Sequence, residues 1–156
     1  MTAPEFATNG QLPGGGASGW VGNLRTPVAW GLVWGCLQAA SPLAFFWLVD
    51  TTVYAIGIIL IAAIYIGFSV ADGRGKVIAV ETLVAAAFVV VAAMGMTGSA
   101  WLLVAGLAGH GIKDLWQQHT QFVVNTRWWP PFCATVDFVA AALIAVAIVA
   151  DFHFRW

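Results

Sequence analysis

The segment that decides the fold is residues 77–96, which read VIAVETLVAAAFVVVAAMGM. Glu81 is the only ionisable residue among these twenty. A helix needs about 20 mostly apolar residues to cross the hydrocarbon core of a bilayer, with roughly 17 to 25 tolerated. The segment therefore predicts one transmembrane helix that carries a carboxylate.

Four other segments have the same apolar character, at residues 27–49, 53–71, 100–116 and 131–150. Short breaks separate the first four helices, and a longer connection at residues 117–130 precedes the last one. Connections this short predict that the first four helices are antiparallel neighbours. The predicted fold class is an all-α polytopic membrane protein, a bundle of five transmembrane helices.

The first of these helices is the least regular. Gln38, Ser41 and Pro42 interrupt its apolar run, and Pro42 removes one backbone hydrogen bond. A re-entrant or broken first helix, which would leave four spans, is the alternative. The predicted organisation is a flexible cytoplasmic tail, a five-helix transmembrane domain and a short aromatic end, at residues 1–26, 27–151 and 152–156.

The composition of the whole chain supports a membrane location. Of its 156 residues, 61% are hydrophobic and 8% are charged, whereas soluble domains carry about 25% charged residues. The composition excludes a soluble enzyme, a nucleic-acid-binding protein and a disordered tail protein. Cys36 and Cys133 lie singly in apolar runs and show neither CxxC spacing nor a disulfide framework.

The basic residues predict the orientation. If five helices span, five of the six basic residues lie on one side of the membrane: Arg25, Arg74, Lys76, Lys113 and Arg127. Arg155 lies on the other side. The positive-inside rule makes the basic side cytoplasmic, so we expect the N-terminus inside and the C-terminus outside, in the cytoplasmic membrane of a bacterium.

Among the ionisable residues inside the predicted helices, four are candidate functional residues: Glu81, His110, Asp114 and Asp137. A charged side chain at the centre of a membrane helix costs about 2.5–3.5 kcal/mol, so it normally has a partner or a function. With a rise of about 1.5 Å per residue, Glu81, His110 and Asp137 lie roughly 7–9 Å from the cytoplasmic end, and Asp114 lies nearer the interface. Three helices therefore place ionisable groups at one depth, and these four residues are the predicted site.

The fourth helix carries a polar stripe. His110, Lys113, Asp114 and Gln117 follow i, i+3, i+4, i+7 spacing and share one face. His119 can join this stripe only if the helix ends near Trp116. On the fifth helix, Cys133 and Asp137 are four residues apart and also share a face.

Three functions fit these residues. The favoured interpretation is a scaffold or accessory subunit in which the acids Asp72, Glu81, Asp114 and Asp137 are neutralised by the bases Arg74, Lys76, Lys113 and Arg127. Its partners would be membrane lipids and another membrane protein or a second copy of the chain, with no nucleic acid.

The first alternative is an intramembrane enzyme acting on a lipidic substrate. Glu81, His110, Asp114 and Asp137 would act in acid–base catalysis, or His110 and Asp114 would be candidate ligands of a divalent metal. No cofactor is assigned, and a metal is not the favoured interpretation. The second alternative is conduction of protons or small solutes by an oligomer, because buried Asp, Glu and His can relay protons.

Residues 108–116, AGHGIKDLW, and residues 127–133, RWWPPFC, carry a resemblance. They resemble short segments of small bacterial multispan membrane proteins with a His-Gly-x-x-Asp-x-Trp pattern, a loop, and a proline-led helix containing an Asp. The resemblance covers the last third of the chain and implies that His110, Asp114 and Asp137 belong together. It implies no activity. That pattern often continues into a His pair, where this chain has Gln117, Gln118 and His119.

Overall fold

The computed structural model describes residues 24–124 and 126–151, and this part of the chain is all-helical. Its five helices are α2 (Arg25–Ala44), α3 (Asp50–Asp72), α4 (Gly75–Thr97), α5 (Ala100–Thr120) and α6 (Trp129–Val149). The predicted all-α fold class is therefore confirmed. The tail at residues 1–23 and the aromatic end at residues 152–156 lie outside the described residues.

Within the described ranges, three helices are long and apolar enough to cross a membrane: α3, α4 and α6. Such helices indicate a multi-pass membrane protein. Helices α2 and α5 are of similar length but more polar, α5 because it carries the stripe that starts at His110 and α2 because of residues such as Gln38 and Ser41. The structure thus supports membrane residence without confirming five spans.

Helix α2 ends five residues earlier than predicted, at Ala44 instead of Val49. The chain leaves helical geometry at Phe45, and a turn closed by the Leu48 amide and the Phe45 carbonyl follows. Pro42 does not break α2. The carbonyl of Gln38, which Pro42 leaves without its usual backbone donor, accepts a hydrogen bond from the Ser41 hydroxyl at 2.7 Å.

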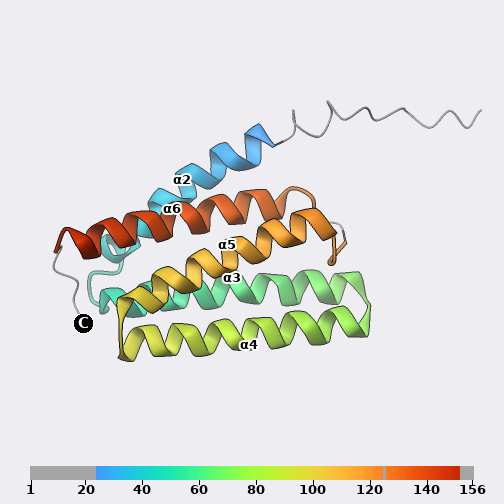
Figure 1. The fold of residues 1–156 in the computed structure, drawn as a ribbon, viewed down its shortest axis with the longest axis horizontal. Coiled ribbons are helices and arrows are strands. Elements are labelled where there is room, and N and C mark those ends of the chain that lie inside the picture. Colours follow the sequence, from blue (N-terminus) through green and yellow to red (C-terminus); the bar gives the residue numbers. More distant parts are fainter. Residues whose placement is uncertain (1–23, 125, 152–156) are drawn as a thin grey trace, which may run out of the picture.

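The packing order differs from the order along the chain. Helices α3, α4 and α5 contact their sequence neighbours, as predicted, but α2 packs mainly against α6 and only weakly against α3. Figure 1 shows α6 and α5 between α2 on one side and the α3–α4 pair on the other. The prediction that α2 and α3 are close antiparallel neighbours is therefore correct only in part. Helix α2 contacts α3 weakly and packs mainly on α6, because the small residues on one face of α2 fit against α6.

Glycines explain this choice of partner. A Cβ atom at Gly31 would lie 2.6 Å from the Cβ of Thr135, and one at Gly35 would lie 2.7 Å from the Cβ of Val139. The two glycines are four residues apart and so form one strip along α2. Small residues on a strip of this kind let helix backbones approach closely in a membrane.

The core of the bundle has two parts. The larger part packs residues of α3, α4, α5 and α6, including Ile58, Leu103 and Ile144. A smaller part near the α3–α4 and α5–α6 connections contains Tyr65, Val77 and Val123. His110 lies where the two parts meet, because its ring contacts Tyr65 on one side and Phe88 on the other.

Candidate functional site

The polar stripe of α5 points into the bundle. His110, Asp114 and Gln117 are buried and Lys113 is partly buried, whereas Ile112, Leu115 and Trp116 on the opposite side are exposed. This is the face predicted from the i, i+3, i+4, i+7 spacing, so the stripe is confirmed. An apolar outward face with a polar inward face is expected of a helix that borders lipid on one side and a polar site on the other.

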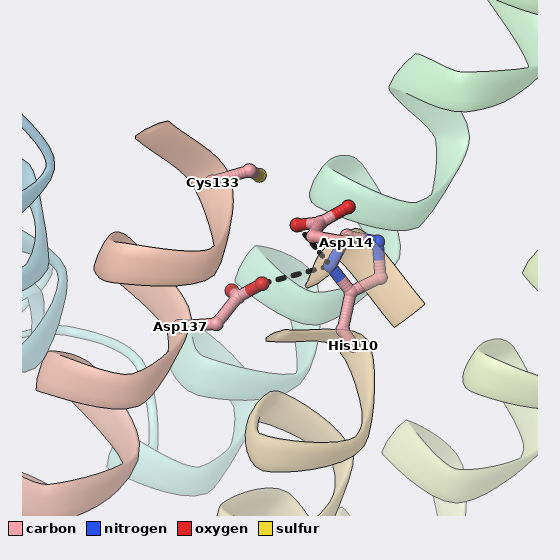
Figure 2. Close-up of side chains that lie close together, drawn as sticks. All are labelled: His110, Asp114, Cys133 and Asp137. Atoms are coloured by element: carbon pink, nitrogen blue, oxygen red, sulfur yellow. Dashed lines mark hydrogen bonds and ion pairs between the residues drawn. The ribbon is translucent and has the colours of Figure 1, made fainter. Parts of the chain in front are cut away.

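His110 joins the two acids predicted to belong with it. Its Nδ1 atom lies 2.8 Å from Oδ2 of Asp137 on α6 and 3.4 Å from Oδ2 of Asp114, one turn further along α5. Figure 2 shows both carboxylates pointing toward the imidazole. The histidine is 2% exposed and the two aspartates are fully buried, so bulk water does not solvate these groups.

Close packing of α5 on α6 makes this meeting possible. Gly111 lies under the ring of Phe138, and a Cβ atom there would be 3.0 Å from the ring. A Cβ atom at position 111 would require the Phe138 ring to move by a few tenths of an ångström. In the sequence His110-Gly111, the histidine supplies the polar side chain, and the glycine leaves room for α6 to lie close to α5.

Cys133 is the residue that the predicted site lacked. Its thiol is buried on α6, and its Sγ atom and one ligand atom each of His110, Asp114 and Asp137 all lie within 4.8 Å of one another. We call His110, Asp114, Cys133 and Asp137 the α5–α6 cluster. The sequence signal was the four-residue spacing of Cys133 and Asp137, which placed them on one face without assigning the thiol a role.

Several carboxylate oxygens of the α5–α6 cluster have no hydrogen-bond partner. In the part of the chain that the structure describes, they are Oδ1 of Asp137 and both oxygens of Asp114. Buried polar atoms in native proteins are nearly always paired, and an unpaired buried charge is more costly still. These oxygens therefore indicate that the α5–α6 cluster accommodates a positive or hydrogen-bonding partner.

Glu81 lies outside the α5–α6 cluster. Its Oε2 atom is 2.7 Å from the Lys113 ammonium group, and Lys113 also lies 3.1 Å above the centre of the Tyr65 ring. Four residues were predicted as one site, with Glu81, His110 and Asp137 at one depth and Asp114 nearer the interface. The structure brings His110, Asp114 and Asp137 together and pairs Glu81 with a base instead. Lys113 and Asp114 are consecutive, so their side chains diverge by about 100° around the helix and reach different neighbours.

The predicted ion-pair network is present in part. Glu81 pairs with Lys113, and Asp72 pairs with Arg74 at 2.5 Å. Asp114 and Asp137 face His110 instead of the predicted lysines and arginines. Two of the four acids are thus neutralised as a scaffold would require, and the two in the α5–α6 cluster are not neutralised in that way.

The Asp72–Arg74 pair joins two connections at one end of the bundle. Arg74 donates to the carbonyl of Phe122 at 2.6 Å, and the amide of Val124 donates to Asp72 at 3.0 Å. These contacts hold the α3–α4 connection against the α5–α6 connection. They bear out the expectation that the two basic loops lie together.

Helix α5 runs to Thr120, one turn further than predicted. The side chain of Gln117 fixes the following turn: its Nε2 donates to the Val123 carbonyl at 2.7 Å, and its Oε1 accepts from the Val123 amide at 3.2 Å. Because α5 continues past Trp116, His119 is turned away from the stripe and exposed. His119 therefore takes no part in the site.

A groove between α2, α3 and α6 shares one residue, Cys133, with the α5–α6 cluster. Its volume is about 460 Å³, within the range of small-molecule sites, and its walls are aromatic and aliphatic. Trp34 of α2, Ile64 of α3 and Phe132 of α6 are among its lining residues. Cys133 belongs both to the lining of this groove and to the α5–α6 cluster.

Comparison of the chain with protein-family models, with curated proteins and with solved structures finds no match. The resemblance to small bacterial multispan proteins therefore stays a prediction. The site must be interpreted from its own chemistry, which combines an imidazole, two carboxylates and a thiol beside an apolar groove.

Proposed function

We propose that the chain is a five-span integral membrane protein that takes a mostly apolar molecule from the bilayer and holds its polar end at the α5–α6 cluster. The observation that carries this proposal is the double position of Cys133, which lines the apolar groove and belongs to the buried polar group. The proposal develops the enzyme interpretation, in which the substrate is lipidic, and leaves the reaction type open.

The five-span topology rests on helix length and on the direction of the stripe. Helices α2 and α5 contain 20 and 21 residues, which corresponds to about 30 Å at 1.5 Å per residue. The polar residues of α5 face inward, and apolar residues such as Ile112 and Leu115 face outward. Trp30, Leu37 and Leu43 give α2 a comparable apolar surface.

The orientation rests on the joined loops. The α3–α4 and α5–α6 connections meet through Asp72 and Arg74, and Lys76 and Arg127 flank them. Positive charge concentrated at one end places that end in the cytoplasm. With five spans the N-terminus is cytoplasmic and the C-terminus external, in the cytoplasmic membrane of a bacterium.

The character of the groove supports the class of ligand. Its lining is dominated by tryptophan, phenylalanine, isoleucine and valine, so it offers few hydrogen bonds to a polar molecule. Apolar pockets with a few convergent polar groups are the usual form of small-molecule sites. A long-chain molecule with a small neutral end that donates a hydrogen bond, such as a long-chain alcohol, matches both parts.

The scaffold interpretation keeps one specific observation in its favour. The Glu81–Lys113 and Asp72–Arg74 pairs satisfy charges within the chain and hold helices and loops together. A scaffold does not use the carboxylate oxygens that lack partners at the α5–α6 cluster. Occupancy of the groove by a ligand is therefore the measurement that separates the two functions.

The test uses the full chain in lipid nanodiscs and a photoreactive long-chain alcohol with a diazirine on its alkyl chain. Ile64→Trp narrows the groove, and Ala63→Trp adds the same bulk to the exposed neighbouring position on α3. We expect adducts on groove residues in the wild type, a severalfold loss of labelling in Ile64→Trp, and no change in Ala63→Trp. Equal labelling in both variants, with adducts spread over the outward faces, would contradict the proposal and favour the scaffold.

A further inference from the structure

The α5–α6 cluster has the donor composition of a transition-metal site. It offers the Nδ1 atom of His110, the Sγ atom of Cys133 and one carboxylate oxygen each from Asp114 and Asp137, all within 4.8 Å of one another. Each of the four residues is buried. Imidazole, thiolate and carboxylate are the three side-chain ligand types that zinc uses in proteins.

The α5–α6 cluster contains more acidic than basic groups. Two carboxylates face one imidazole, so the cluster keeps a net negative charge when both carboxylates are ionised, even with His110 protonated. The nearest ammonium group on the same helix, that of Lys113, is 2.7 Å from Glu81 and serves that acid. A buried charge without a partner costs several kcal/mol, so the cluster either keeps a proton on one carboxylate or binds a cation in its place.

The unpartnered oxygens give independent support. Within the described residues, both oxygens of Asp114 and Oδ1 of Asp137 accept no hydrogen bond, and all belong to fully buried side chains. The Tyr65 hydroxyl near Asp114 is likewise without a partner of good geometry. The cluster therefore has spare acceptor capacity where a cation would be bound.

The distances fit a single ion. A tetrahedral zinc site with bonds of about 2.0–2.3 Å has neighbouring ligand atoms about 3.3–3.7 Å apart. The Nδ1 atom of His110 is 3.4 Å from Asp114 and 2.8 Å from Asp137, and all four ligand atoms lie within 4.8 Å of one another, so separations must change by about 1 Å at most to reach that geometry. Figure 2 shows the Cys133 side chain projecting toward the same space from the preceding turn of α6.

We propose that His110, Asp114, Cys133 and Asp137 form an intramembrane binding site for one divalent transition-metal ion, with zinc the best match. Nitrogen and sulfur ligands select this class over Mg²⁺ and Ca²⁺, which prefer oxygen. Binding releases the thiol proton of Cys133 to solvent as the thiolate becomes a ligand, and the proton between Nδ1 of His110 and Oδ2 of Asp137 leaves to solvent or moves to Nε2 so that a neutral imidazole ligates through Nδ1. The inference concerns the same cluster as the proposed function but does not require the apolar ligand.

The test measures Co²⁺ and Zn²⁺ binding to the purified full chain in detergent. Co²⁺ reports on the ligands because a cobalt–thiolate bond gives a charge-transfer band in the near ultraviolet. We expect one equivalent of Co²⁺ and this band in the wild type, with Zn²⁺ displacing Co²⁺. Cys133→Ser should lose the band and bind at least about tenfold more weakly, and Asp137→Asn should also lose affinity.

The chain supplies a matched control in its other cysteine. Cys36 lies on α2 and is exposed, so Cys36→Ser should keep both the stoichiometry and the band. Elution as a single symmetric species in size-exclusion chromatography shows that each variant is folded. Folded wild-type protein that binds neither ion, or a band that survives in Cys133→Ser or disappears in Cys36→Ser, would overturn the inference.

The metal and lipid experiments fail independently. Protein that binds Co²⁺ but shows no selective labelling of the groove would retain the metal site and lose the proposed ligand. Protein that is labelled at the groove but binds no metal would retain the proposed function and lose the metal site.

Discussion

Lys113 and Asp114 show how much one position along a helix changes the role of a buried charge. Lys113 reaches Glu81 on α4 and covers the ring of Tyr65, so its charge is shared between an acid and an aromatic face. Asp114 turns toward His110 and keeps two oxygens without hydrogen bonds in the described part of the chain. The first residue fits a structural role, and the second fits a site.

At the residue scale, we predict that the Glu81–Lys113 pair is structural. Lys113→Met leaves the carboxylate of Glu81, which is 1% exposed, without its partner. Removing one member of a buried pair costs about 3–5 kcal/mol, whereas replacing both is often nearly neutral. We therefore expect a large loss of stability in Lys113→Met and recovery of most of it in the double variant with Glu81→Met, measured by unfolding in detergent.

The same variants separate the pair from the α5–α6 cluster. Glu81→Met with Lys113→Met should retain Co²⁺ binding, because neither residue is among the four donors. If the loss of stability in the double variant equalled the sum of the losses in the two single variants, that result would contradict a direct pair.

At the element scale, α2 decides the shape of the groove. The Gly31–Gly35 strip lets α2 lie against α6, and the turn after Ala44 then carries the chain across to α3. The tryptophans of α2 are left as a wall facing α3 and α6 across the groove. Moving α2 would therefore change the groove while leaving the helices that hold the α5–α6 cluster in place.

We predict that Gly35→Ala displaces α2. The added Cβ atom would lie 2.7 Å from Val139 and 3.0 Å from the Val136 carbonyl, so one helix must shift. Overpacking of this kind typically costs about 1–3 kcal/mol. We expect a lower thermal unfolding midpoint in detergent and weaker labelling by the photoreactive long-chain alcohol.

The matched control is Gly67→Ala on α3. No atom lies within 4 Å of a Cβ placed there, and alanine is a better helix former than glycine by about 1 kcal/mol. This variant should be neutral or slightly more stable. A similar loss in both variants would contradict the contact with α6 as the cause, because nothing crowds position 67.

At the scale of the whole molecule, charge and hydrophobicity divide the bundle into a basic end and an apolar body. Arg74 and Asp72 tie two connections together at the basic end, and exposed apolar side chains cover much of the helical surface. Exposed apolar surface on this scale is unfavourable in water and is expected of a protein surrounded by lipid.

We predict that the α3–α4 connection is cytoplasmic and the α4–α5 connection is external. In a background with both native cysteines replaced by serine, Gly75→Cys and Ser99→Cys place single thiols at exposed positions of these two connections. A membrane-impermeant maleimide added to intact cells should label Ser99→Cys and leave Gly75→Cys unlabelled until the membrane is opened. The reverse pattern would invert the orientation, and labelling of both before opening would contradict a spanning α4.

The sequence by itself predicted the positions of the helices and the face of α5 that carries the site. Apolar runs of spanning length placed α3, α4 and α6 within a few residues, because hydrophobic length is a local property. The spacing of His110, Asp114 and Gln117 placed them on one face of α5, since helical geometry alone fixes that relation. Helix ends were less accurate at Ala44 and Thr120, where Phe45 and the side chain of Gln117 decide the local conformation.

Only the tertiary structure decided which charges meet. Depth along the helices suggested that Glu81, His110 and Asp137 belong together, but depth does not specify the rotation of one helix relative to another. Packing of α5 against α6 brings Asp137 and Cys133 to His110, and the position of Lys113 takes Glu81 away. Side-chain partners across helices depend on packing between segments far apart in the chain, so no local pattern could separate the paired charges from the candidate metal site.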